Sequence, residues 1–458
     1  MRILVIGGGG REHALVWKIG GSPLLRSRAD LMCVPGNAGI EDHASCLPAP
    51  ARGLTDVAAL ADLAVKERID LTVVGPEAPL MSGLVDELTR RGLAVFGASR
   101  AAARLEGSKV FAKEFMQRHG IPTAPFEVFS SCRDTLDWLG STERSFPIVV
   151  KADGLAAGKG VVVAPDRASA QEAARAILEE KRFGAAGERI VIEECLTGAE
   201  ISFFALTDGE SATPLASCQD HKRLGDGDTG PNTGGMGALS PSTDLDPDME
   251  RRIMERVIQP AIAGMAEEGS PYRGVLYAGL MLTERGPMVL EYNARFGDPE
   301  AQVLMPRLES DLVPLLVAAS DAGGRMRDIA GRIRWRPEWA ACVVLASAGY
   351  PGSPETGRMI RGLEMAAKVP QTEVFHAGTR RERDGSLRDR IVTAGGRVLA
   401  VTSLGRDLGE ALNRAYAGVE CLSFEGMQFR RDIGGAALSR LAARPEPLLG
   451  HTPREREG

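Results

Sequence analysis

The sequence predicts a multidomain protein of mixed α/β and α+β class, with an N-terminal doubly wound parallel sheet and a small C-terminal α+β domain. Over residues 1–100, short apolar strands alternate with helical segments, the pattern of a parallel sheet covered on both faces. Charged residues and a proline interrupt this pattern near residues 325–340, where we expect a domain boundary. A chain of 458 residues is long enough for about two to four domains.

Continuous apolar runs define the strands of the predicted N-terminal sheet. Such runs are expected where helices cover both faces of a sheet. The expected strands span residues 3–6, 31–34, 71–74 and 94–96. The expected helices span residues 12–19, 57–67 and 80–91.

Strands and helices follow one another less regularly in the rest of the chain. Strands are expected over residues 147–152, 161–163, 189–193, 201–206, 275–282, 288–292, 342–346, 374–377 and 398–401. Helices are expected over residues 110–119, 169–180, 250–265 and 408–417. Residues 224–237 are rich in Gly, Asp and Thr and predict a loop, and the tail after residue 441 predicts a frayed end.

Composition and charge exclude several classes of protein. The chain is 44% hydrophobic and 25% charged, which is ordinary for a globular protein. Its net charge of −6 gives no indication of a basic surface that would bind nucleic acid. No apolar run is long enough to cross a bilayer and no signal peptide is recognisable, so we expect a cytoplasmic protein without a membrane partner. Seven scattered cysteines without a CxxC pair predict reduced thiols rather than disulfides or a zinc site.

A glycine-rich turn lies between the first strand and the first helix, in the segment VIGGGGREHA of residues 5–14. Such a turn presents backbone N–H groups to an anion. A dinucleotide fingerprint would place its third glycine where Glu12 stands, which disfavours a dinucleotide. A smaller phosphate held by Gly9, Gly10 and Arg11 fits better. A turn that needs glycine only for packing is the alternative.

A second glycine-rich loop joins two expected strands, in the segment KADGLAAGKG of residues 151–160. Lys151 ends the first strand and can reach an α- or β-phosphate, while loop N–H groups can fold over the phosphates. The strand–loop–helix motif GxxxxGK[ST] is absent, so this is not a P-loop. An ordinary hairpin with a surface lysine is the alternative.

Two later strands carry polar groups suited to a nucleotide and its metal ion. Glu291 and Asn293 are two residues apart on a strand and therefore share a face. They offer hard oxygen ligands, which suit Mg²⁺ bridging nucleotide phosphates. Arg295 shares that face and can stabilise charge on a transferring phosphoryl group. After the strand expected over residues 189–193, backbone groups near Glu194 can form hydrogen bonds with the edge of an adenine ring. The alternative is an acidic strand end that faces solvent.

The lysine-ended strand, glycine loop, acidic strand end and Glu-x-Asn strand together resemble the ATP-grasp fold. Further segments make the chain similar to the phosphoribosylamine–glycine ligase family, the glycinamide ribonucleotide synthetases. These segments are GGREHAL (9–15), PGNAG (35–39), VGPEAPL (74–80), LEGSK (105–109), QDHKR (219–223), DTGPNTGGMG (228–237), RFGDPE (295–300), FHAGT (375–379) and GGRVL (395–399). The resemblance runs in family order from residue 1 to about residue 436.

The resemblance implies an ATP-dependent ligase of purine synthesis that joins glycine to 5-phosphoribosylamine through glycyl phosphate, giving ADP and phosphate. It implies ATP as co-substrate and Mg²⁺ or Mn²⁺ at Glu291 and Asn293. Residues implied to surround the nucleotide are Lys109, Lys151, Gly158, Lys159, Gly160, Glu193, Glu194, Leu196 and Glu200.

For the other two substrates, the resemblance implies that Gly9, Gly10 and Arg11 hold the ribose 5-phosphate. Asp220 and Asp298 are implied for the ammonium group of glycine, and Arg295 for its carboxylate or the acyl phosphate. His221 is a candidate general base, with a hydrogen-bonded loop histidine as the alternative.

The implied fold has a Rossmann-like substrate domain over residues 1–104 and a central ATP-grasp fold of two subdomains over residues 105–325. The flexible subdomain is expected near residues 123–194, and the C-terminal α+β domain over residues 326–440. We expect a monomer whose partners are small molecules only. The alternatives are another ATP-grasp carboxylate–amine ligase, a biotin-dependent carboxylase subunit, a dinucleotide-dependent oxidoreductase or a catalytically silent nucleotide-binding regulator.

Overall fold

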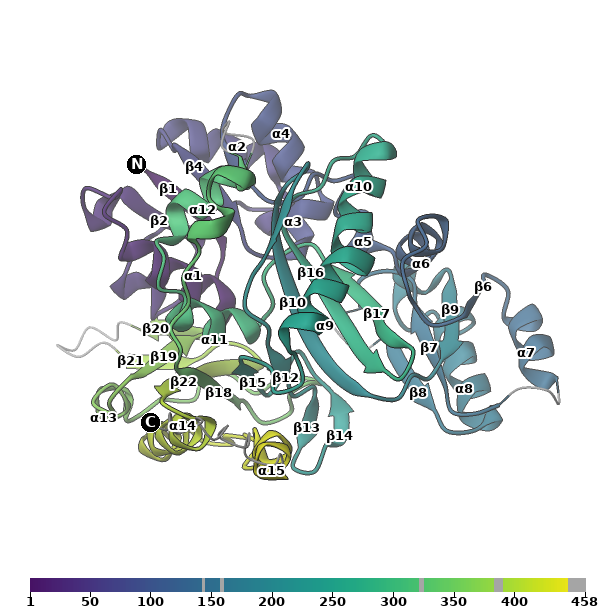
Figure 1. The fold of residues 1–458 in the computed structure, drawn as a ribbon. Helices are drawn as coiled ribbons and strands as arrows, with labels where there is room; N and C mark the ends of the chain where they lie inside the picture. Colours follow the sequence, from purple (N-terminus) through teal and green to yellow (C-terminus); the bar gives the residue numbers. More distant parts are fainter. Residues whose placement is uncertain (142–144, 157–159, 321–324, 383–389, 444–458) are drawn as a thin grey trace, which may run out of the picture.

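The computed structural model describes residues 1–141, 145–156, 160–320, 325–382 and 390–443. Within these ranges, four sheets of four or five strands and two small hairpins organise the chain (Figure 1). In the same ranges no helix is both long and apolar enough to cross a membrane.

The N-terminal sheet is parallel, with its strands in the order β3, β2, β1, β4, β5. Its strands are β1 Ile3–Gly7, β2 Leu31–Pro35, β3 Ser45–Cys46, β4 Leu71–Val74 and β5 Val95–Phe96. Helix α1 (Gly10–Gly20) packs on one face, and helices α2 (Val57–Lys66) and α4 (Leu84–Arg90) pack on the other. The prediction of a doubly wound parallel sheet is therefore confirmed.

The helix predicted over residues 80–91 is in fact two helices, α3 (Glu77–Met81) and α4. The chain turns between them at Gly83, whose φ is +86°. Glycine enters this left-handed region without the steric cost that a Cβ would impose. An isolated glycine in an apolar periodic stretch therefore marks the break.

Two antiparallel four-stranded sheets form the middle of the chain, and we call them the outer and the central sheet. The outer sheet has the order β6, β9, β7, β8, and the central sheet β11, β10, β16, β17. Outer strands are β6 Phe126–Phe129, β7 Ile148–Ala152, β8 Val161–Ala164 and β9 Ile190–Glu194. Central strands are β10 Ala199–Asp208, β11 Ala212–Pro214, β16 Arg273–Thr283 and β17 Gly286–Asn293.

Helices cover both of these sheets. Figure 1 shows the outer sheet, with α7 (Cys132–Gly140) and α8 (Arg167–Leu178), at the end of the molecule away from the N-terminal sheet. The other helices of this region are α5 Arg104–Gly107, α6 Lys109–Arg118, α9 Pro247–Ile253, α10 Gln259–Glu267, α11 Glu300–Arg307 and α12 Leu312–Ala318. A π-helical segment joins α9 to α10 just before Pro260, which lacks the N–H that a regular helix would use there.

The C-terminal sheet is antiparallel, in the order β12, β15, β18, β22, β19. Its strands are β12 Gln219–Asp220, β15 Gly237–Ser240, β18 Trp339–Ala346, β19 Thr372–His376 and β22 Arg397–Gly405, with helices α13 Leu363–Ala366, α14 Leu408–Cys421 and α15 Gly435–Ala443. The sheet thus takes two strands from the middle of the chain. Part of the loop predicted over residues 224–237 is a hairpin, β13 (Arg223–Gly225) with β14 (Thr229–Asn232).

Buried histidines join the N-terminal and C-terminal sheets. The ring Nδ1 of His13 accepts a hydrogen bond from the backbone N–H of His376 at 2.7 Å, and the two ring centroids are 5.6 Å apart. The Asn37 side chain donates to the carbonyl oxygens of both Gly8 and His376. Burial holds the pKa of His13 well below its usual value and lowers the pKa of His376 to about 4.

This contact predicts acid sensitivity. Between about pH 6.5 and 4, the unfolded chain binds a proton at His376 that the folded chain does not, so the free energy of unfolding falls as pH falls. Replacing His376 with Asn, which cannot titrate, should reduce the loss between pH 7 and 4.5 by about 1–2 kcal/mol. Urea denaturation of both proteins at the two pH values measures it. Identical losses would contradict the expectation.

Candidate active site

The site forms where the outer sheet, helix α6 and the central sheet meet. Asp153, just after β7, binds the start of α6: its Oδ1 accepts from the Ser108 hydroxyl at 2.7 Å and from the Val110 N–H at 2.9 Å. The N–H of Lys109 donates to the Asp153 carbonyl at 2.9 Å. These bonds satisfy the free N–H groups of the helix start and bring Lys109 beside Lys151.

A buried ion triad supports Lys151. Each oxygen of the Glu193 carboxylate, on β9, pairs with a different ammonium group, that of Lys113 from α6 and that of Lys151 from β7. Burial alone would raise the pKa of Glu193, but the two lysines outweigh it and hold that pKa below its usual value. Burial also lowers the pKa of Lys113 to about 8. The triad therefore fixes Lys151 rather than leaving Glu193 free for a ribose.

Lys151 reaches the strand that carries Glu291 and Asn293. Its Nζ donates to the carbonyl oxygen of Leu290 at 3.1 Å, so the tip of β7 lies directly on β17. Tyr292 is buried, whereas Glu291 and Asn293 on either side of it are more exposed, in keeping with the expectation that they share a face. The prediction that the lysine strand and the Glu-x-Asn strand come together is consistent with this contact.

Four cations surround Glu291. Burial would raise the pKa of the Glu291 carboxyl, but Lys222, Lys151, Lys109 and Arg295 together lower it, in that order of effect. Glu291 is therefore ionised at neutral pH. A carboxylate with an excess of positive charge around it leaves room for additional anionic charge, such as that of a polyphosphate.

Arg295 is held firmly in place by acidic partners. Its Nη2 lies 2.8 Å from Glu106 Oε1, and its Nε lies 3.5 Å from Glu77 Oε2. The same Nη2 donates to Asn293 Oδ1 at 3.3 Å. The other oxygen of Glu106 accepts from the Ala294 N–H at 2.7 Å. Arg295 is thus fixed beside the Glu291–Asn293 face.

Asp220 and Glu200 converge on Lys222. The Lys222 ammonium pairs with Glu200, and it lowers the pKa of Asp220 against a larger effect of burial. With Glu300, Glu200 and Glu291 also nearby, the pKa of Asp220 is raised above its usual value. A further cation bound beside Asp220, such as an ammonium group, would favour its ionised form.

His221 faces away from this cluster. Its Nε2 accepts from the Gly434 N–H at 3.2 Å, while its buried Nδ1 has no partner among the described residues. Burial, and then Arg430, lower the pKa of His221 to about 4. These contacts match the alternative of a hydrogen-bonded loop histidine, and they give no support to the general-base role.

The carboxylate of Glu12 holds the N-terminal glycine turn in place through two hydrogen bonds. Glu12 Oε2 accepts from the Gly9 N–H at 2.7 Å, and its Oε1 accepts from Arg11 Nε at 2.5 Å. A Cβ built on Gly75 would lie 2.2 Å from Glu12 Oε1, so this position accepts only glycine without rearrangement. Because the Glu12 carboxylate already accepts from the N–H of Gly9, that N–H is not free for any phosphate, whether of a dinucleotide or of a ribose 5-phosphate.

Asp298 lies next to this glycine turn although it is far away in sequence. Cβ atoms built on Gly9 and Gly10 would lie 3.4 and 3.5 Å from its carboxylate oxygens. Gln302 Nε2 donates to Asp298 Oδ1 at 2.7 Å. Burial would raise the pKa of Asp298, but Arg397 and then Arg11 lower it. An ionised Asp298 thus borders the predicted phosphoribosylamine loop.

The remaining predicted residues are placed as follows. Glu194 is exposed and pairs with Arg285, whereas Leu196 is buried in a small apolar cluster with Ala124 and Met288. The carbonyl oxygen of Gly160 accepts from the Ala152 N–H at 2.8 Å and closes the hairpin of β7 and β8. Gly158 and Lys159 lie outside the described residues.

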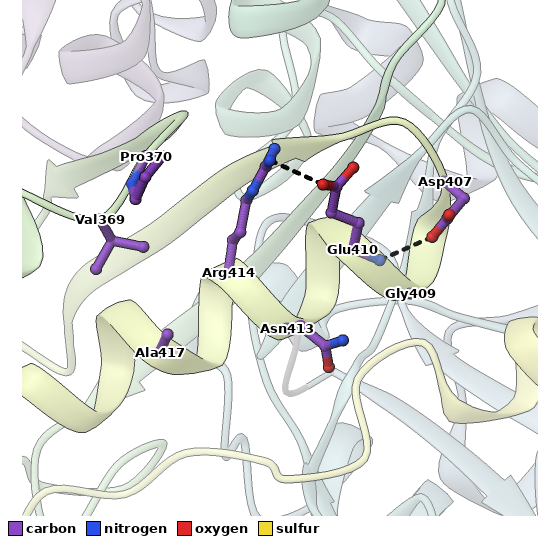
Figure 2. A pocket seen from close by; sticks show the side chains of 8 residues that line it. All are labelled: Val369, Pro370, Asp407, Gly409, Glu410, Asn413, Arg414 and Ala417. Carbon is purple, nitrogen blue, oxygen red and sulfur yellow. Dashed lines mark hydrogen bonds and ion pairs between the residues drawn. The ribbon is translucent and has the colours of Figure 1, made fainter.

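A surface hollow elsewhere does not coincide with this cluster. Figure 2 shows it at the start of α14, where Asp407 Oδ1 accepts from the Glu410 N–H and Arg414 pairs with Glu410. These charges already serve to cap and stabilise the helix. None of the predicted site residues lines the hollow.

Sequence reasoning did not single out Lys113, Lys222 or Glu106. Lys113 follows Lys109 by four residues on one helix, so the spacing places both on one face and could have identified it. Lys222 and Glu106 lie inside noted motifs, QDHKR and LEGSK, but only the structure shows that they contact Glu200 and Arg295.

A two-sheet core in which a lysine-ended strand lies on a Glu-x-Asn strand defines the chain as an ATP-grasp protein. Family models of phosphoribosylglycinamide synthetase match along the chain in order: the N domain over residues 1–106, the ATP-grasp (A) domain over residues 107–301 and the C domain over residues 340–436. The chain belongs to the phosphoribosylglycinamide synthetase family.

Named relatives cover nearly all of the chain. Phosphoribosylamine–glycine ligases from Caulobacter vibrioides and Mesorhizobium japonicum are 51% and 50% identical over 440 residues, which is 96% of this chain and 99% of each relative. The ligase from Escherichia coli K12 is 48% identical over 441 residues, with the same coverage of each chain.

Solved structures give the same result for the fold. The phosphoribosylamine–glycine ligase of Thermotoga maritima matches with a TM-score of 0.78 at 35% identity, covering 94% of this chain and all of that one. A biotin carboxylase domain from Hydrogenobacter thermophilus, in complex with MgADP and bicarbonate, matches with a TM-score of 0.69 over 93% of this chain and 91% of that one. At 16% identity, this second match supports the fold alone.

Proposed function

We propose that this chain is an ATP-dependent ligase that joins glycine to 5-phosphoribosylamine, giving glycinamide ribonucleotide, ADP and phosphate. The observation that supports it most is the contact of Lys151 with β17 beside Glu291, because that contact assembles cations where a triphosphate's charge would lie. Near full-length similarity to proteins named for this reaction supports the choice of substrates.

A divalent cation fits the residues present. Glu291 is ionised and Asn293 offers an amide oxygen, so the pair supplies the hard oxygen ligands that Mg²⁺ or Mn²⁺ takes. Within the described ranges no three His, Cys, Asp or Glu side chains gather as a complete metal cage. A bound cation would therefore need further ligands from nucleotide phosphates and water, and it would neutralise phosphate charge there.

The reaction needs positioning rather than a protein nucleophile. The carboxylate oxygen of glycine attacks the γ-phosphorus of ATP, ADP leaves, and glycyl phosphate forms. The amine of phosphoribosylamine then attacks the carbonyl carbon, phosphate leaves with the C–O electron pair, and the amine loses a proton. Lys109 and Lys151 hold the nucleotide phosphates, and Arg295 stabilises charge on the transferring group.

Roles for the other residues follow from their surroundings. Asp220 accepts from the ammonium group of glycine. Leu196 and its apolar neighbours Ala124 and Met288 contact the adenine ring of the nucleotide. Gly9, Gly10 and Arg11 border the ribose 5-phosphate.

The enzyme works as a cytoplasmic monomer with domains near residues 1–104, 105–325 and 326–440.

An ADP-release assay tests this function. The expected result is ADP formation that requires ATP, glycine and phosphoribosylamine together, with phosphoribosylamine supplied by condensing ribose 5-phosphate with ammonia. An assay with free alanine instead of free glycine is the control for the amino-acid substrate. ADP release that ignores the amine, or that bicarbonate supports in place of glycine, would contradict the proposal.

A further inference from the structure

Arg397, the first residue of β22, joins the C-terminal sheet to two segments more than about 95 residues away in sequence. Its Nη1 donates to the carbonyl oxygens of Gly234 and Asp298, both at 2.5 Å. Its Nη2 lies 3.1 Å from the carboxylate oxygen Oδ2 of Asp298. One guanidinium group thus binds both the backbone and the side chain of Asp298.

These contacts fix the direction of the Asp298 carboxylate. Oδ2 faces Arg397, while Oδ1 accepts from Gln302 Nε2. With both oxygens oriented, the carboxylate stays beside the turn of Gly9 and Gly10, where a built Cβ already comes within 3.5 Å of it. Only a group with several donors in a rigid plane can make this set of bonds.

The same guanidinium supports the turn at Gly234 and Gly235. The N–H of Gly234 donates to the Tyr350 hydroxyl at 2.9 Å, so a second residue of the C-terminal domain also holds this turn. Gly235 has φ +111°, and a Cβ there would lie 2.4 Å from Pro299 Cδ. The turn therefore packs on Asp298 and Pro299 in one arrangement, with Arg397 between the two segments.

We propose that Arg397 is a positioning residue that holds Asp298 and the Gly234–Gly235 turn against the N-terminal glycine turn, so that the C-terminal domain completes the phosphoribosylamine side of the site. This inference rests on the proposed function. Arg397 acts through Asp298 and the turn, and it touches neither the lysines of the nucleotide cluster nor Glu291 in the structure described.

Steady-state kinetics of R397M and R397K test the proposal. We expect R397M to raise KM for phosphoribosylamine at least tenfold while KM for ATP stays within about twofold. A rise in KM for glycine alone would mean that Asp298 serves the ammonium group of glycine, and would overturn the proposal. R397K should recover only part of the loss, because an ammonium group replaces the charge but not the planar set of donors. A general loss of stability would instead change all three KM values, or none, and would overturn the proposal.

Arg381 supplies the matched control. It also joins the C-terminal domain to a distant segment, with Nε 2.9 Å from Glu41 Oε2 and Nη2 3.0 Å from Asp42 Oδ1, and its side chain is equally exposed at 20%. R381M removes a comparable interdomain contact away from Asp298. It should lower the unfolding temperature as much as R397M does, but leave KM for phosphoribosylamine unchanged.

Calorimetric titration with ribose 5-phosphate separates this inference from the proposed function. We expect the R397M variant to bind the probe at least tenfold more weakly than the wild type and R381M. If the wild type binds ribose 5-phosphate but forms no ADP with glycine, the proposed ligase function fails while the titration still tests Arg397. Equal affinity in R397M and the wild type, or no binding to the wild type, overturns the inference.

Discussion

Replacing Glu291 with Gln is expected to lower kcat of ADP formation by at least about 100-fold while the protein stays folded. The change keeps the shape of the side chain but removes a negative charge on which Lys222, Lys151, Lys109 and Arg295 all act. It also removes the ionised ligand of the proposed cation. The magnesium concentration for half-maximal rate should therefore rise as well as the rate fall.

Glu284 provides the matched control for this experiment. It is exposed in the turn between β16 and β17, on the same hairpin as Glu291. Glu284→Gln should leave both kcat and the magnesium dependence unchanged. Urea denaturation of each variant shows whether folding is retained. A Glu291→Gln enzyme within a few fold of wild-type rate would remove this residue from the site.

The strands were predictable because their signal is local. Continuous apolar runs predicted β1, β2, β4 and β5 within about one residue, since a strand buried on both faces must be apolar throughout. The two-residue strand β3 (Ser45–Cys46) was missed because it has no such run. The pairing of β15 with β18 was not predictable, because it joins segments about 100 residues apart. The β13–β14 hairpin was missed because its Gly, Asp and Thr residues lack the apolar alternation that marks a strand.

The candidate site was predictable in its residue types but not in its contacts. Two-residue spacing placed Glu291 and Asn293 on one face, in agreement with the burial of Tyr292 between them. The same alternation separates Glu193, which is buried, from its neighbour Glu194, which is exposed, whereas the family resemblance implies that both surround the nucleotide. Only the fold shows which of the two acids faces Lys151.

This difference predicts very different costs for two neighbouring substitutions. Glu193→Gln is expected to lower the free energy of unfolding by about 3–5 kcal/mol, because it leaves the ammonium groups of Lys113 and Lys151 buried without their partner. Glu194→Gln breaks only the exposed pair with Arg285 and should cost at most about 1 kcal/mol. Urea denaturation of both variants at pH 7 measures the contrast, and equal costs would contradict the triad.

The pH dependence of stability tests whether the unpaired ammonium group of Lys113 causes the loss in Glu193→Gln. A lysine in the unfolded chain has a pKa near 10.5, whereas burial lowers the pKa of Lys113 in the folded wild type to about 8. In the folded Glu193→Gln variant Lys113 has lost its partner and is kept neutral. The free energy needed to remove its proton falls as pH rises. The gap between Glu193→Gln and the wild type should therefore shrink between pH 7 and 9.5, while that of Glu194→Gln stays flat. Lys113→Met added to Glu193→Gln should recover part of the lost stability at pH 7, because one of the two unpaired cations is gone. No recovery would mean that the loss arises from packing around residue 193 rather than from buried charge.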